Sequence, residues 1–517
     1  MQQTSRRQFL SHVGQGMLAA SLGTALAQDM GLSSAAVWDD TQPLKFGRLE
    51  PLVALMQETP VTKLIPALMQ KLESGIELKT LVAAGAMANA RTFGGQDYIG
   101  FHTFMALSPA YTMAQRLPGN QQALPIFKVL YRNTQRIQDK GGHDHEVLHQ
   151  VALPQSPLPQ YDGNALRESM RQCNMDQAEK QFAVIAQGKP ADAFDELQPL
   201  VQDQIDVHRV VLAWRAWETL NLTGIDHAHT LLRQSVRYCV AHETEVLRRN
   251  RSTPEIRTVL PQVIDQFQLA SKQLGQRRAD ESWIKKLADV VYRSDRKQAA
   301  EAVAQAIAEG IHPEDIGEAI TLAANALVLH DPGRPQDWAA ENKPAGSVHG
   351  DSVGVHASDA ANAWRCIARV SSPRNAIASL IVAAYHTAGQ TQRQLPQPYP
   401  QAEHLEKIKA TKPESLLIAI EAAIRSKDQA LTCALVHQFG AAGLPERQIF
   451  DVLLRFALSE DGALHAEKYY MTVLDDFTRS RPAFRWRHLD ALARVTASEY
   501  GYPAPGYAQA CELLKVN

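Results

Sequence analysis

The stretch that decides the fold is residues 299–329, AAEAVAQAIAEGIHPEDIGEAITLAANALVL. An alanine-rich helical pattern ends at Gly310, and a second apolar pattern begins at Ile316. Glycine is favoured just after a helix, and proline and acidic residues suit the first turn of the next helix. The same arrangement recurs at residues 75–81, 188–194 and 443–449. This pattern predicts a repeated unit of helix, glycine turn and helix.

The remainder of the chain is also typical of helix. Alanine, leucine, glutamate, glutamine and arginine are frequent, and apolar residues recur at intervals of three and four. No alternating run of β-branched residues reaches the length of a strand. We therefore predict an all-α fold.

A glycine followed shortly by a histidine comes after each of the four helix pairs. The first and third units contain G-x-H, and the second and fourth contain G-x-x-H; the histidines are His102, His227, His356 and His465. The alternation predicts an internally duplicated helical-repeat array of four units, with pseudo-twofold halves at residues 44–275 and 291–517 and a join at 276–290. The alternative is that alanine-rich helices resemble one another by composition alone.

The first 27 residues are typical of an export signal. Ser5, Arg6 and Arg7 begin a twin-arginine pattern, SRRQFL, and a short, moderately apolar run ends at the A-x-A cleavage pattern before Gln28. We expect the twin-arginine translocon to export the folded chain and cleavage to occur near Ala27, with a linker at residues 28–43. The expected location is the periplasm, without a membrane anchor after cleavage.

Charge and cysteine content limit the functional classes. The chain has 53 basic and 55 acidic residues, so bulk charge does not favour nucleic acid as a partner. The five cysteines are widely spaced and form no CxxC motif, which disfavours thiol redox chemistry and c-type haem attachment. Phosphate loops, dinucleotide glycine fingerprints, serine-hydrolase elbows and EF-hand loops are missing from the sequence, so no nucleotide cofactor is expected.

The four repeated histidines are candidate catalytic groups and metal ligands. Imidazole binds iron, copper, zinc and manganese, and equivalent residues of a repeated unit can converge on its symmetry axis. If they converge, nearby hydrogen-bond partners or replacement ligands would come from Asp226, His229, His349, Asp351 and Glu467. The alternative is that each histidine fills the same structural niche in its own unit.

Residues 145–149, HEVLH, have the spacing of a zinc-protease motif, with His145 and His149 as metal ligands. Two glycines precede the motif and Pro154 follows it, which disfavours the long helix that such a motif requires. Three readings stay open: a metallohydrolase, an auxiliary metal or proton-relay role at the rim of a pocket, and a polar loop.

Two long irregular segments, residues 140–162 and 330–351, interrupt the helices. Such loops often form pocket walls. In the second loop, Arg334, Trp338 and His349 are candidate cofactor-binding or ligand-binding residues, because they combine to form a plausible lining for an anion or a carbonyl group. The alternative is a solvated crossing between helices.

Three stretches resemble the questin-oxidase-like family: FHTFMAL at residues 101–107, DVHRVVLAWRA at 206–216 and LHAEKYY at 464–470. The resemblance implies a large, almost wholly helical protein that oxidises aromatic polyketides without a cofactor. From the residues themselves, we predict a histidine-lined central pocket and a metal-dependent or related oxidoreductase acting on a small organic molecule. The alternatives are a helical-repeat binding protein with structural histidines and a metallohydrolase that uses HEVLH.

Overall fold

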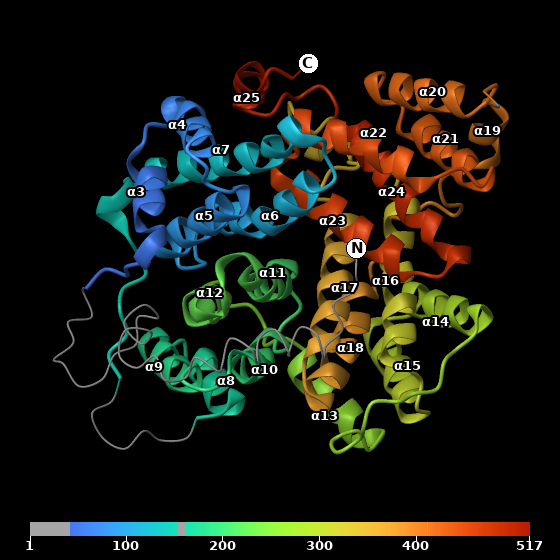
Figure 1. Ribbon diagram of the computed structural model, residues 1–517. Helices are drawn as coiled ribbons and strands as arrows, with labels where there is room; N and C mark the ends of the chain where they lie inside the picture. Colours follow the sequence, from blue (N-terminus) through green and yellow to red (C-terminus); the bar gives the residue numbers. More distant parts are fainter. Residues whose placement is uncertain (1–41, 154–160, 411, 517) are drawn as a thin grey trace. The chain divides into compact units, whose positions relative to one another are not determined.

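The computed structural model describes residues 42–153, 161–410 and 412–516 (Figure 1). The predicted export signal and its cleavage site lie outside these residues. The described residues form twenty-three α-helices and several short 3-10 turns, and they contain no β-strand. The prediction of an all-α fold is therefore confirmed.

The described chain divides into two compact units. Unit 1 comprises the described residues up to Tyr111, Val129–Arg257 and Cys366–Ala376, and unit 2 comprises Thr112–Lys128, Thr258–Arg365 and the described residues from Ile377 onward. The main boundary between the two units lies between Arg257 and Thr258, before the predicted join at 276–290. Each unit also includes a segment that belongs to the other predicted half. The internal duplication stays a prediction.

Unit 1 is built from the N-terminal helices. These are α3 (Glu50–Glu58), α4 (Val61–Glu73), α5 (Leu78–Phe93), α8 (Gly163–Arg171), α9 (Met175–Ile185), α10 (Pro190–Val201), α11 (Val207–Thr223) and α12 (Ala228–Arg248), with 3-10 turns η2 (Gly47–Leu49), η4 (Gly142–His145) and η5 (Ile225–His227). Five helices contribute residues to both units: α6 (Tyr98–Ala114), α7 (Ala123–Asp139), α13 (Ile256–Gln266), α17 (Val353–Val370) and α18 (Pro373–Thr387).

Unit 2 contains the remaining helices. These are α14 (Glu281–Arg293), α15 (Arg296–Ala308), α16 (Pro313–Leu329), α19 (Ala402–Glu406), α20 (Pro413–Arg425), α21 (Gln429–Ala441), α22 (Glu446–Ser459), α23 (His465–Arg479), α24 (Pro482–Glu499) and α25 (Tyr507–Leu514), with η3 (Gly119–Gln122), η6 (Gln336–Trp338) and η7 (Gly462–Leu464).

The predicted glycine turns separate helices in all four places. Gly75, Gly310 and Gly443 have a positive φ that favours glycine, and each follows the helix that the alanine-rich pattern predicts. Gly188 lies between α9 and α10 in the same way. The four glycine-histidine stretches also lie where predicted, at or just before the starts of α6, α12, α17 and α23.

The core of unit 2 forms around α24, which packs against α16, α21, α22 and α23. Every residue of α24 from His488 to Glu499 is buried. A helix that is buried all round must satisfy its polar side chains internally. Arg494 does so by donating to the carbonyl oxygens of Val328 and Asp331, at 2.7 and 2.6 Å. The C-terminal end of the same helix carries the buried carboxylate of Glu499 into the candidate site.

The core of unit 1 forms around α5, which packs against α3, α11 and α12. Its residues from Leu81 to Phe93 are all buried. Small alanine side chains let neighbouring helices approach closely, and the side-chain amide nitrogen of the buried Asn89 lies within hydrogen-bond distance of Gly100, Thr103 and Asn133. The apolar side chains of α5 thus pack against three neighbouring helices.

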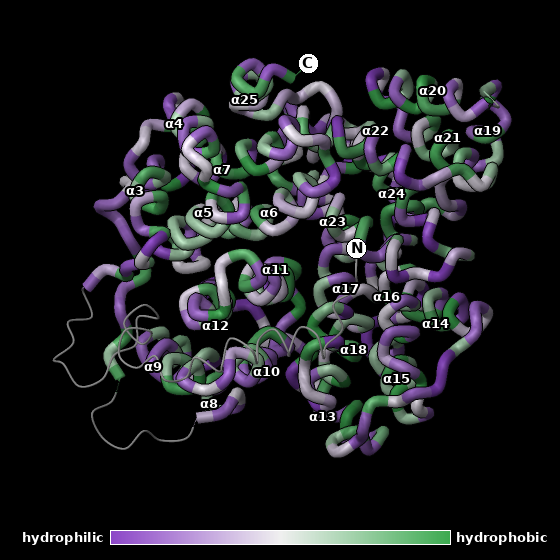
Figure 2. Tube along the Cα trace, in the orientation of Figure 1, coloured by the Kyte–Doolittle hydropathy of each residue, from purple (hydrophilic) through white to green (hydrophobic). Residues whose placement is uncertain are grey.

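Apolar and polar residues are mixed along the helices rather than separated into wholly apolar segments (Figure 2). Among the described residues, no helix has the length and apolar character needed to span a bilayer.

Candidate functional site

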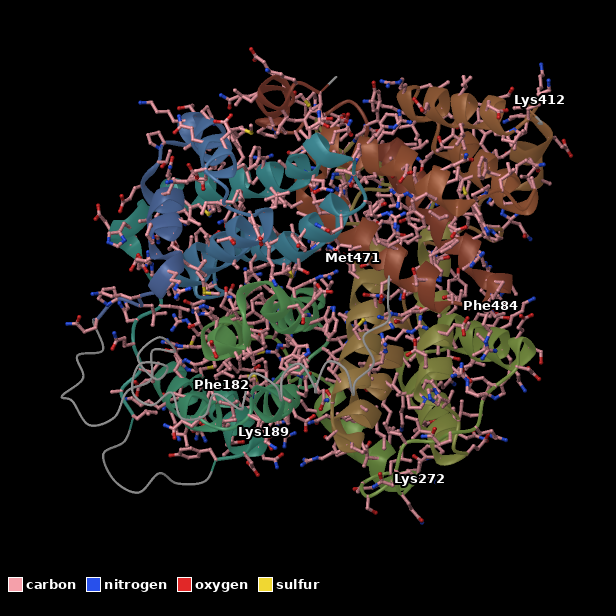
Figure 3. All side chains as sticks on the ribbon, in the orientation of Figure 1. Phe182, Lys189, Lys272, Lys412, Met471 and Phe484 are labelled. Carbon is pink, nitrogen blue, oxygen red and sulfur yellow. The ribbon has the colours of Figure 1, made fainter. Side chains whose placement is uncertain are left out.

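Three histidines of unit 2 lie together. His349 follows the irregular loop, His356 lies in the first turn of α17, and His465 begins α23, the helix on which Figure 3 labels Met471. The ring centroid of His465 lies 5.6 Å from that of His356 and 6.2 Å from that of His349. His349 and His465 are both buried. Two of the four repeated histidines therefore meet in this unit, next to His349.

The backbone that leads into His465 has an unusual conformation. Gly462, Ala463 and Leu464 have φ angles of 50°, 48° and 66°, in the left-handed region that residues with a side chain rarely adopt. The Nδ1 atom of His465 lies 3.2 Å from the carbonyl oxygen of Ala463. Such backbone strain persists only where the surroundings impose it, and it clusters at functional sites. Here it orients a buried imidazole at the start of a helix.

Gly350 lets the irregular loop approach His465 closely. A Cβ atom at position 350 would lie 2.1 Å from the Cβ of His465 and 2.7 Å from its Cγ. The amide of Gly350 donates to Oε1 of Glu499 at 2.9 Å. A residue without a side chain is therefore required for the loop, the start of α23 and the end of α24 to meet.

Two buried carboxylates and a lysine lie beside the histidines. The Oε1 atom of Glu499 lies 3.5 Å from Nε2 of His349. Burial raises the pKa of Glu499 above its usual range, although the positive charges of His349 and Lys128 act in the opposite direction. Nζ of Lys128 lies 2.6 Å from Oε1 of Glu467, and both side chains are almost fully buried. The carbonyl oxygens of Ala457 and Glu460 accept hydrogen bonds from Lys128.

Asp351 connects His349 to the basic residues of the loop. Its Oδ1 lies 2.5 Å from Nη2 of Arg334 and 3.4 Å from Nδ1 of His349, and its Oδ2 lies 2.7 Å from Nζ of Lys343. Burial alone would raise the pKa of Asp351, but the close contact with His349 and the hydrogen bond from Lys343 lower it below its usual range. Asp351 is therefore an ionised carboxylate that orients His349.

A cavity of about 530 Å³ opens beside Asp351. Arg334 and Trp338 line it, and Arg296, Asp331 and Arg393 complete its charged wall, whereas His349 does not line it. The volume lies within the range of typical small-molecule sites. Because Asp351 lines the cavity and also contacts His349, the cavity and the buried histidines are parts of one site.

The other two repeated histidines belong to unit 1. His102 packs against Phe101 and against His208 of α11, with ring centroids 4.9 and 4.8 Å apart. His208 and His242 both lie within 3.5 Å of the carboxylate of Asp206, which also caps α11. His208, His242 and Asp206 were not predicted as site residues, because none of them belongs to a repeated glycine-histidine stretch and helix packing brings them together.

His227 and the nearby His229 lie at the start of α12. The ring of His227 meets Phe46 edge-on at 6.2 Å, and His229 stacks on Phe182, labelled in Figure 3, at 5.9 Å. Within the described part of the chain, no three histidine, cysteine, aspartate or glutamate side chains form a group that could hold a metal ion. The neighbouring His349, His356 and His465 do not form such a group either. The predicted metal centre stays a prediction of the sequence, and we derive no chemistry from a metal.

The HEVLH segment is not a helix. His145 ends the 3-10 turn η4, and the backbone is extended at Glu146. Glu146 is engaged by Nε of Arg91 at 2.8 Å and by Nδ1 of His143 at 2.8 Å. The zinc-protease motif requires its two histidines to share one face of a helix, and His145 and His149 do not. Glu146 pairs with Arg91 and His143.

Sequence reasoning missed Glu499, Lys128, Arg296 and Arg393. None of them lies in a motif, and each joins the site only through tertiary packing. We find no match to this chain among protein-family models, curated proteins or solved structures. The resemblance to the questin-oxidase-like family therefore stays a prediction.

Proposed function

We propose that this protein binds a small organic molecule in the cavity lined by Arg334 and Trp338, and that His349, which contacts the cavity wall through Asp351, serves as an acid-base group for the bound molecule. The observation that carries the proposal is the position of Asp351, whose carboxylate lines the cavity and contacts Nδ1 of His349. A carboxylate on one imidazole nitrogen fixes the orientation of the ring.

The other side of His349 supports the same role. Its Nε2 faces Glu499, and the raised pKa of that buried carboxyl makes it a better proton acceptor than an exposed glutamate. His349 thus lies between the ionised carboxylate at the cavity wall and a buried carboxyl of raised pKa, so a change of charge in the cavity is coupled to a proton between His349 and Glu499. The strained start of α23 and the glycine at position 350 hold this arrangement together.

The test is proton-linked binding. A library of small organic acids, amides and aromatic compounds is screened by thermal shift, and hits are titrated calorimetrically in two buffers of different ionisation enthalpy. We expect net proton exchange on binding to the wild type. The exchange should be lost in His349→Gln and retained in the control His145→Gln, which changes an exposed histidine of unit 1. Unaltered proton exchange in His349→Gln, or a library without a single hit, would overturn the proposal.

The second candidate is a binding protein without catalysis. It is favoured by the exposure of Trp338, which is 62% accessible at the wall of the cavity. This candidate predicts binding without proton exchange in the wild type, so the same titration separates the two functions. The oxidoreductase class and the periplasmic location stay predictions of the sequence.

A further inference from the structure

The wall of the cavity carries more positive charge than its acidic residues neutralise. Arg334 is paired with Asp351, as is the neighbouring Lys343. Arg296 and Arg393 also line the cavity, and neither forms an ion pair with any residue that the structure describes. Arg296 lies over the ring of Tyr385, at 5.8 Å, and Arg393 over that of Trp338, at 5.1 Å. Two guanidinium groups are therefore held in place without an ion pair, and with Asp331 included the lining has three arginines and two aspartates.

Three residues of the lining also have buried polar atoms that lack a hydrogen-bond partner among the described residues. They are Nε of Arg334, Oγ of Ser347 and Oε1 of Gln394, and all three residues line the cavity. A buried polar atom without a partner costs about 1–3 kcal/mol, so such atoms usually mark a position that a ligand or water fills. Two of the three can donate a hydrogen bond, as an anion requires.

The start of α17 adds to the positive potential. Ser352 and Val353, at the beginning of this 18-residue helix, line the cavity. The first amides of a helix have no partner within it, and the helix dipole places partial positive charge there. The rest of the lining includes the apolar side chains of Pro332, Pro335 and Trp338.

We infer that the cavity binds an organic carboxylate, with its charge between Arg296 and Arg393 and its apolar body against Trp338. A guanidinium group matches the two oxygens of a carboxylate, and apolar walls favour an organic acid over inorganic phosphate. This inference rests on the proposed function, because it names the chemical class of the molecule that His349 would serve.

The experiment measures equilibrium binding of benzoate, neutral benzamide and inorganic phosphate by calorimetry. We expect benzoate to bind at least tenfold more tightly than benzamide or phosphate. Arg296→Gln and Arg393→Gln should each weaken benzoate binding about tenfold or more. Arg248→Gln, which changes an exposed arginine of unit 1, should leave it unchanged. Far-UV circular dichroism checks folding, and Arg296→Lys retains the charge if Arg296→Gln is poorly folded.

Equal binding of benzoate and benzamide would overturn the inference, as would a preference for phosphate or unchanged binding in both arginine variants. The His349→Gln variant separates this inference from the proposed function. Benzoate should bind that variant with an affinity close to that of the wild type, because His349 does not line the cavity. Carboxylate binding without proton exchange would retain the inference and reject the acid-base role.

Discussion

Replacing Lys128 with methionine tests the buried charges beside the candidate site. Nζ of Lys128 lies 2.6 Å from Oε1 of Glu467, and the two side chains are 1% and 0% exposed. Lys128 also donates to the carbonyl oxygens of Ala457 and Glu460. Removing one partner of a buried pair leaves an uncompensated charge and typically costs about 3–5 kcal/mol. We therefore expect Lys128→Met to lower the free energy of unfolding by roughly 4 kcal/mol.

A second substitution separates the charge from the packing. Glu467→Gln in the Lys128→Met background removes the buried charge, so the double variant should regain more than half of the lost stability. The measurement is urea-induced unfolding followed by far-UV circular dichroism. A protein with more than one compact unit can unfold in more than one transition. The free energy of unfolding is therefore taken from the transition that Lys128→Met shifts. Lys285→Met, an exposed lysine of α14, serves as the control and should change stability by about 0.5 kcal/mol or less.

Two results would refute this reasoning. A loss of less than about 1 kcal/mol in Lys128→Met would mean that the pair is not buried as described. A double variant as unstable as the single one would mean that lost packing, rather than the unpaired carboxylate of Glu467, causes the destabilisation. The pKa of Glu499 should also be higher in Lys128→Met than in the wild type, because the positive charge of Lys128 lowers it.

Three further perturbations test the structure around the site. Gly350→Ala should destabilise unit 2 by about 1–3 kcal/mol because of the clash with His465, whereas Gly119→Ala, with open space around it, should be nearly neutral in thermal unfolding. Ala463→Gly should stabilise by up to about 1 kcal/mol in urea, because it relieves a left-handed φ at an exposed position; a loss of stability would contradict the strain. Burial raises the pKa of Asp476 to about 7, so folding favours the protonated form and stability falls as the pH rises from about 4 to 7. The free energy of unfolding of Asp476→Asn should therefore rise relative to that of the wild type as the pH increases across that interval. A difference between the two proteins that does not change with pH would contradict the raised pKa of Asp476.

Local chemistry explains what could be predicted of the fold. The helices around Gly310 and Gly443 follow from alanine-rich periodicity and from a glycine conformation that ends a helix, both of which depend on neighbours in the sequence. The same holds for the irregular loop that carries Arg334 and Trp338, because its prolines and glycines disfavour helix. HEVLH shows the limit of spacing alone, since the segment is extended where the motif requires a helix.

The amino-acid sequence by itself determined the all-α class, the helix boundaries at the glycine turns, and the place of His349, Arg334 and Trp338 in an irregular loop. Only the tertiary structure decided which groups meet. Glu499 reaches His349, and Lys128 reaches Glu467, through the packing of helices that are far apart in the chain. The physical reason is that capping and periodicity act over a few residues, whereas the partner of a buried charge is chosen by the packing of the whole unit.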